Sequence, residues 1–145
     1  MKKLLTGILM GLSLLIVSGA HAQFRPIPGA VTDSFKIRYP NAEGVSWGDK
    51  ITSFQASFKL DKEEYKAKYS IKGEWQGSEK KVGFDALPAA VKDGLNKSKY
   101  ADWNKGTAVM RYLPGNQIQY NLSVNKGDFQ RRTLVFNPDG RMLKD

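Results

Sequence analysis

The segment "TSFQASFKLDKEEYKAKYSI", residues 52–71, decides the fold because apolar and polar side chains alternate along two runs within it. Every second residue is apolar from Phe54 to Leu60, and the same holds from Tyr65 to Ile71. A strict period of two places one face of a strand against a core and the other face in water. We therefore expect two neighbouring strands, each with one buried and one wet face.

The acidic stretch "DKEE", residues 61–64, separates the two runs. Its oxygens could serve a cation, but the spacing lacks the glycine and the terminal bidentate glutamate of a calcium loop. A charged hairpin tip is the favoured interpretation. The stretch "QIQYNLSV", residues 117–124, alternates in the same way and predicts a further strand, and "NKGD" (125–128) and "NPDG" (137–140) are turn signals.

Two short segments predict helices that cover the buried strand faces. The segments "IPGAVTDSF" (27–35) and "LPAAVKDGL" (87–95) share Pro, Ala, Val and Asp at an offset of 60 positions. In each segment two apolar residues stand four apart, which predicts one core-facing side of a helix. These residues are Val31 and Phe35 in the first segment, and Val91 and Leu95 in the second.

The repeated order of elements predicts an α+β fold. We expect two tandem helix-plus-antiparallel-meander repeats, about 26–82 and 83–145, which form one sheet with the helices packed on one face. No long linker separates the repeats, so residues 23–145 are expected to form a single domain. Pro40 should end the first helix, because the residue before a proline resists the α region. Asp85 is the expected N-cap of the second helix, which should run to about Lys99.

Residues 1–22 are expected to be a cleaved signal peptide. Two lysines precede an apolar run, and Ala20-His21-Ala22 forms an A-x-A site that predicts cleavage after Ala22. The alternative, an uncleaved membrane anchor, is disfavoured because the run is short for a membrane span. The mature chain is therefore expected to be soluble, without a membrane span, and either periplasmic or secreted.

Composition limits the chemistry that the mature chain can perform. The 145 residues include no Cys, and the single His lies within the predicted signal peptide. This excludes Cys nucleophiles, disulfides, Ser-His-Asp triads and the usual zinc and copper sites from the mature chain. The 23 basic and 14 acidic side chains make the chain basic, but the lysines are spread without a nucleic-acid motif. We expect no enzyme, no cofactor, no metal and no nucleic-acid partner.

Three stretches resemble the PepSY-like periplasmic family, also described as beta-lactamase-inhibitor-protein-like. They are "VSWGDKITSFQASFK" (45–59), "GEWQGSEKKVGFDALPAAVKDGL" (73–95) and "FNPDGRML" (136–143), and the resemblance covers about Ile27 to Asp145. The family's turn usually carries Asp before its Gly, so Asp139-Gly140 fits the pattern and Lys72-Gly73 departs from it. The departure weakens the idea that the two turns share a ligand-binding role.

The resemblance implies tandem helix-plus-sheet repeats in an exported, non-enzymatic protein. The distant relative from which the family takes its name, the beta-lactamase inhibitor protein, binds its target enzyme with an open sheet face. The family as a whole has no agreed function, and it offers no catalytic residues to carry over to this chain.

The polar side chains of the alternating runs should form an open sheet face rich in cations and amides. Such a face would attract anionic surfaces and offer hydrogen-bond donors. Plain solvation of exposed strands is the alternative interpretation. The candidate partner-binding residues are Lys59, Lys66, Lys68, Gln119, Asn121, Arg131 and Trp75, with Gln55 and Ser57 beside them. Of the three tryptophans, Trp75 is the candidate because a turn places it near the rim, and tryptophan in a small domain is more often packed in the core.

Two functions follow as hypotheses. The first is a binding protein that docks a protein partner of the cell envelope on the open face, as an inhibitor or regulator. The alternative is a carrier or sensor of a small anionic or apolar ligand between helices and sheet, which requires an aromatic pocket of roughly 300 Å³ or more. The sequence identifies neither the partner nor the oligomeric state.

Overall fold

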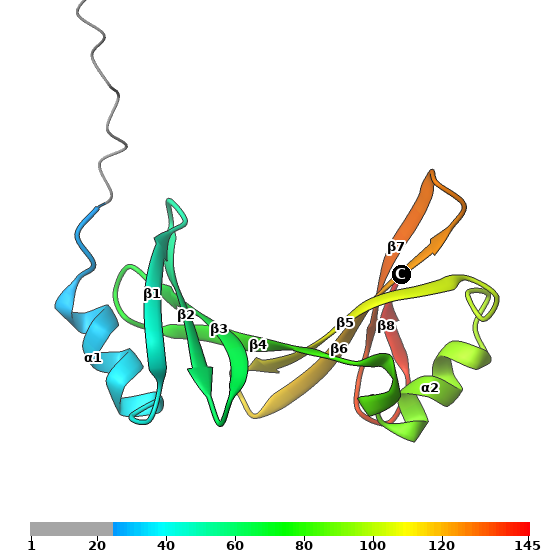
Figure 1. Cartoon of the computed structure of the whole chain (residues 1–145), viewed down its shortest axis with the longest axis horizontal. Coiled ribbons are helices and arrows are strands. Elements are labelled where there is room, and N and C mark those ends of the chain that lie inside the picture. Colours follow the sequence, from blue (N-terminus) through cyan, green and yellow to red (C-terminus); the bar gives the residue numbers. More distant parts are fainter. Residues whose placement is uncertain (1–24) are drawn as a thin grey trace, which may run out of the picture.

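The structure, a computed structural model, describes residues 25–145, so the predicted signal peptide lies outside the described residues. One antiparallel sheet contains eight strands, and each strand pairs with its neighbours in sequence. Figure 1 shows the elements in chain order. They are α1 (Gly29–Arg38), β1 (Glu43–Asp49), β2 (Ser53–Leu60), β3 (Glu63–Ser70), β4 (Trp75–Val82), the 3-10 helix η1 (Phe84–Ala86), α2 (Ala89–Asn96), β5 (Asn104–Leu113), β6 (Gln117–Lys126), β7 (Gln130–Phe136) and β8 (Met142–Lys144).

Two helices and an open antiparallel sheet confirm the predicted α+β class. Whether the chain is an internal duplication stays a prediction. Within residues 25–145, neither helix is long and apolar enough to cross a membrane.

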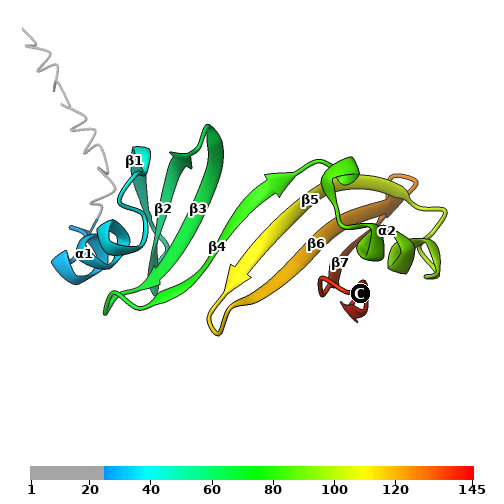
Figure 2. The ribbon, with the colours of Figure 1, turned by 90° about the horizontal axis from the view of Figure 1, so that it is seen from below.

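The alternation in β2, β3 and β6 produces the predicted two-faced strands. Phe54, Ala56 and Phe58 are buried in β2, while Lys59 is exposed. Along β6 the burial alternates in the same way, with Leu122 buried next to half-buried polar neighbours. The two helices lie toward opposite ends of the sheet, on the side that receives the apolar side chains (Figures 1 and 2).

The core is divided into two clusters, one beneath each helix. The buried side chains of the first cluster are Val31, Phe35, Phe54, Ala56, Phe58, Ala67 and Tyr69. Those of the second cluster are Leu87, Val91, Leu95, Tyr100, Ala108, Tyr120, Leu122, Val124, Leu134 and Phe136. Because each helix covers only its own cluster, the middle of the sheet has no helix over it on either side (Figure 2).

The helix boundaries confirm one expectation and correct two others. The first helix ends at Arg38, before Pro40, as predicted. Asp85 is not the N-cap of α2, because it lies in η1, and the position before α2 is held by Pro88 without a side-chain cap. The second helix ends at Asn96 rather than about Lys99, since the Ser98 amide and hydroxyl both donate hydrogen bonds to the Leu95 carbonyl and close the last turn.

Two strand residues depart from the predicted alternation. Ile71 was expected to face the core but is 49% exposed, because β3 ends at Ser70 and the chain turns there. Ser53 was expected on the wet face but is only 1% exposed. Both departures fall at strand ends, and Ser53 keeps its place in the register opposite Ser70 although it is buried.

Two turn glycines allow the sheet to approach the helices closely. A Cβ atom on Gly73 would lie 2.5 Å from the carbonyl oxygen of Ala30 in α1. A Cβ atom on Gly140 would lie 2.0 Å from the carbonyl oxygen of Ala90 in α2. Both glycines also have positive φ, of 89° and 87°, which L side chains rarely adopt. The backbones of these two turns therefore lie in direct contact with the backbones of the helices.

Candidate functional site

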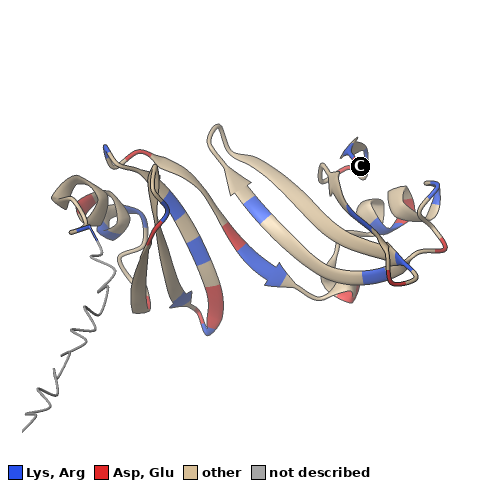
Figure 3. Cartoon of the chain, turned by 90° about the horizontal axis from the view of Figure 1, so that it is seen from above, with Lys and Arg blue, Asp and Glu red and all other residues tan. Residues whose placement is uncertain are grey.

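The face of the sheet opposite the helices carries a row of polar side chains from β2 to β6. Residues directly opposite each other in antiparallel strands share one face of the sheet. Register pairs Ser57 with Lys66, Lys66 with Glu79, Glu79 with Arg111, and Arg111 with Gln119. We call this side of the sheet the open face, and Figure 3 shows it uncovered with cations across its strands.

Six of the seven residues predicted for partner binding lie on the open face. Lys66 and Gln119 belong to the row, and Lys68 lies opposite Gln55. The remaining three are Lys59 opposite Glu64, Asn121 opposite Val109, and Arg131 opposite Asn125. Arg131 is in the β6–β7 hairpin, so it stands apart from the others.

Trp75 does not lie on the open face, and its predicted placement there is wrong. It pairs with Tyr69, whose side chain is in the first core cluster, and its ring packs on the helix side. The cause is a bulge in β4, where Lys68 pairs with Gly77 but Tyr69 pairs with Trp75. One extra residue moves every earlier side chain of the strand to the other face.

Sequence reasoning missed several charged residues of the open face, because β4 and β5 lack a clean alternation. Glu79 and Lys81 in β4 and Arg111 in β5 belong to this face by register. Counting residues on from the readable strand β3, through the turn at Lys72 and Gly73, also misses Glu79 and Lys81, because the bulge in β4 reverses the alternation. Carboxylates are thus present on the open face, although cations remain in excess.

Most cations of the open face carry no ion pair with another described residue. The Nε atom of Arg111 lies 3.9 Å from a carboxylate oxygen of Glu79. Lys59, Lys66 and Lys68 are exposed and take part in no ion pair within residues 25–145. Their charges therefore add to a positive electrostatic potential over the open face.

The open face is hollowed over its β2–β4 part. A depression of about 650 Å³ is lined by residues that include Ser57, Lys59, Lys66, Glu79 and Lys81. Farther along the sheet, the side-chain oxygen Oδ1 of Asn121 is buried and accepts no hydrogen bond from a described residue. A buried acceptor without a donor is uncommon in folded proteins.

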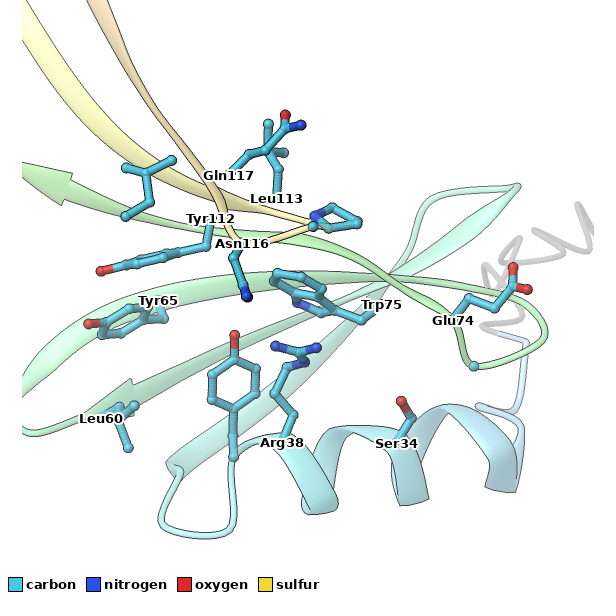
Figure 4. Close-up of a pocket in the computed structure, with 15 residues that line it drawn as sticks. Ser34, Arg38, Leu60, Tyr65, Glu74, Trp75, Tyr112, Leu113, Asn116 and Gln117 are labelled. Carbon is cyan, nitrogen blue, oxygen red and sulfur yellow. The ribbon is translucent and has the colours of Figure 1, made fainter. Parts of the chain in front are cut away.

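A second site lies on the helix side, where the gap between the helices leaves the sheet uncovered. It is a groove of about 780 Å³ between α1, β4 and the turn that joins β5 to β6. We call it the aromatic groove (Figure 4). Its lining residues are Ser34, Arg38, Tyr39, Leu60, Tyr65, Gly73, Glu74, Trp75, Tyr112, Leu113, Pro114, Gly115, Asn116, Gln117 and Ile118.

Hydrogen bonds to one buried serine fix two walls of the aromatic groove. The indole Nε1 of Trp75 donates to Ser78 Oγ at 2.8 Å, and the Tyr39 hydroxyl lies 2.5 Å from the same atom. The guanidinium carbon of Arg38 lies 3.7 Å from the centroid of the Trp75 ring. Arg38, Tyr39 and Trp75 therefore form one rigid end of the groove.

Charged and phenolic groups near the groove have shifted pKa values. Burial raises the pKa of Tyr65 and, more strongly, that of Tyr69, so both phenols stay neutral at physiological pH. The Glu63 carboxylate accepts a hydrogen bond from Lys80 at 2.6 Å, which lowers the pKa of Glu63 and raises that of Lys80. The positive charge of Lys80, which lies beside the Tyr65 ring, is thus already balanced by the Glu63 carboxylate.

The remaining tryptophans are packed. Trp47 lies against Phe35, with ring centroids 5.3 Å apart, and Trp103 lies against Tyr100 at 5.0 Å. Within residues 25–145, no group of three or more His, Cys, Asp or Glu side chains could hold a metal ion.

Comparison with known proteins finds a family model and several solved structures that are similar to this chain. A family model described as "Putative beta-lactamase-inhibitor-like, PepSY-like" matches residues 52–144. A DUF2874 family protein from Bacteroides ovatus ATCC 8483 is 25% identical with a TM-score of 0.77, and the match covers 83% of this chain and 87% of that one. No curated protein matches the chain.

Two further solved structures share the fold. A BLIP-like protein from Bacteroides fragilis NCTC 9343 is 24% identical with a TM-score of 0.77, over 84% of this chain and 86% of its own. A structure of "putative periplasmic proteins" from Bacteroides eggerthii DSM 20697 is 23% identical with a TM-score of 0.73, over 83% of this chain and 88% of its own.

Proposed function

Because this chain belongs to the PepSY-like family, described as beta-lactamase-inhibitor-like, we propose that it is an exported, non-enzymatic binding protein of the periplasm. Its partner is a protein with an acidic surface, which docks on the open face. The observation that carries this proposal is the excess of unpaired cations on a sheet face that no helix covers. Exposed cations steer an acidic partner and set its orientation more than they add affinity.

Exposed apolar side chains at two hairpin tips support the same proposal. Phe129 is 98% exposed at the β6–β7 tip, and Ile51 is 84% exposed at the β1–β2 tip. Both tips rise on the side of the sheet opposite α2, toward either end of the open face (Figure 1). Burial of such apolar anchors supplies affinity that surface charge alone does not.

The proposal is tested with a charge change on the open face. The variant Lys66→Gln with Lys68→Glu removes two cations of the open face without placing a glutamate opposite Glu79. The partner is captured from envelope extract with the wild-type protein, identified, purified and titrated against each variant. We expect the double variant to bind at least tenfold more weakly with an unchanged melting temperature, and wild-type binding to weaken with added salt.

A matched control carries the same charge change elsewhere. Lys36 on α1 and Lys72 in the β3–β4 turn are exposed and lie away from the open face. The variant Lys36→Gln with Lys72→Glu should keep wild-type affinity. Equal affinity of the open-face variant and the wild type would contradict the proposal.

A second function, carriage of a small ligand, is favoured by one observation. The aromatic groove lies between a helix and the sheet, and its volume of about 780 Å³ falls within the range of ligand pockets. The open face and the groove are on opposite sides of the sheet, so the two functions do not exclude each other.

A further inference from the structure

We propose that the aromatic groove binds an amphipathic carboxylate with a flat aromatic body, whose carboxylate pairs with Arg38. The inference rests on the second function, ligand carriage, and not on docking at the open face. The charge, the walls and the rim of the groove indicate the chemistry of this ligand.

Arg38 is the one cation among the residues that line the groove. It takes part in no ion pair or side-chain hydrogen bond within residues 25–145. Its guanidinium lies against the Trp75 ring, which holds the planar fork in place and reduces the entropy lost on binding (Figure 4). A fixed guanidinium with free donors suits a single carboxylate, which it can bind through two parallel hydrogen bonds.

The carboxylate nearest to Arg38 in the lining does not compete for it. Glu74 is the only acidic residue of the lining, and its side chain points away from Arg38 (Figure 4). The Ser70 hydroxyl donates to Glu74 at 3.3 Å, on the far side of the turn. The groove therefore presents a net positive charge at its α1 end.

The remaining walls favour a flat apolar body. Tyr65 and Tyr112 line the groove from β3 and β5, with Leu60 and Ile118 beside them. These aromatic rings are half-buried and contribute apolar surface to the walls of the groove. A ring system bound against these walls would bury apolar surface that neither helix covers.

The side-chain amide of Asn116, in the β5–β6 turn, lies across the groove from α1. Asn116 has a left-handed backbone with φ of 57°, and its side-chain amide points into the groove between Tyr112 and Trp75 (Figure 4). It provides a donor and an acceptor for polar substituents on the ligand. Charge at one end, rings along the walls and an amide at the mouth together define an amphipathic carboxylate.

The test compares three probes on the purified protein. The probes are 1-pyrenebutyrate, its neutral analogue 1-pyrenebutanol, and the aliphatic anion dodecanoate. Binding of the pyrenes is followed by energy transfer from tryptophan to pyrene, and that of dodecanoate by calorimetry. We expect pyrenebutyrate to bind about tenfold more tightly than each of the other two probes.

Two variants locate the binding. Arg38→Gln should weaken pyrenebutyrate about tenfold and leave pyrenebutanol unchanged. Lys36→Gln removes the same charge from the exposed side of α1 and should change neither value. Melting temperatures of both variants are measured, and Arg38→Lys, which keeps the charge without the planar fork, should recover only part of the affinity.

Each other outcome overturns the inference in a distinct way. Equal binding of the acid and the alcohol, or equal effects of Arg38→Gln and Lys36→Gln, would remove the role of Arg38. Dodecanoate as tight as pyrenebutyrate would remove the preference for an aromatic body. No binding of any probe would overturn ligand carriage as a whole, whereas docking on the open face is measured separately with the Lys66 and Lys68 variant.

Discussion

At the scale of single residues, glycines decide how closely the sheet meets the helices. Gly140 has φ of 87°, and the carbonyl oxygen of Ala90 stands where its Cβ atom would be. Gly127 has φ of 61° but faces open space. The two positions separate the cost of a left-handed backbone from the cost of a close approach.

We predict that Gly140→Ala lowers the free energy of unfolding by about 2–4 kcal/mol, because it adds an overlap with the helix backbone to the backbone strain. Gly127→Ala should cost only about 1 kcal/mol, which is the strain alone. Chemical denaturation of both variants and the wild type measures the difference. Equal losses would show that the turn can move away from α2.

At the scale of elements, an ion pair ties the segment before α1 to the end of β1. Arg25 donates two hydrogen bonds to Asp49, of 2.7 and 2.6 Å, and its guanidinium also lies over the Phe54 ring at 4.9 Å. The hydrogen bonds from Arg25 lower the pKa of the Asp49 carboxyl below its usual value. The same carboxylate accepts a hydrogen bond from the backbone amide of Ile51. The φ of Ile51 is 68°, which is rare for a branched residue.

This lowered pKa predicts the direction of a pH effect. In the folded state Asp49 stays ionised at a pH where the unfolded chain takes up a proton, so the folded state binds fewer protons. The stabilisation is therefore present above the usual aspartate pKa, about 4, and is lost as the pH falls through the folded value. Glu63, held by Lys80, contributes with the same sign.

We expect the melting temperature to fall as the pH is lowered from 6 to 3, and Asp49→Asn to flatten part of this fall. Thermal melts at several pH values measure it. Asp102→Asn, at an exposed carboxylate without an ion pair among the described residues, is the control and should keep the wild-type profile. An unchanged slope in Asp49→Asn would contradict the assignment.

At the scale of the whole molecule, one continuous sheet joins two separate cores. The pairing of β4 with β5 is the connection between the strands of the first cluster and those of the second. Loss of packing in one cluster therefore leaves the other cluster's contacts in place. Local stability should differ between the two ends.

We predict that Leu95→Ala, at a fully buried position on the core-facing side of α2, costs about 2–4 kcal/mol of unfolding free energy and acts mainly on its own end. Amide exchange should accelerate in β6 and β7 more than in β2 and β3. Val31→Ala, on the core-facing side of α1, should give the reverse pattern. Uniform acceleration in either variant would show that the sheet unfolds as a single cooperative unit.

The sequence by itself determined the two-faced strands and the two helices that cover them. Residues 54–60, 65–69 and 118–124 alternate strictly, and the side-chain direction along a regular strand depends only on this local period. The lysines of β2 and β3 could be assigned to the wet face for the same reason. The four-residue spacing of Val31 and Phe35 predicted the buried side of α1 in the same local way.

Only the tertiary structure decided the place of Trp75, the charges added by Glu79 and Arg111, and the groove. Counting back from Glu79 without the bulge would put Trp75 on the open face, and one bulged residue moves it to the other side. The groove joins α1, β4 and the β5–β6 turn, which are far apart in sequence. Inter-strand register and the gap between two helices depend on packing across the whole sheet, which no local pattern records.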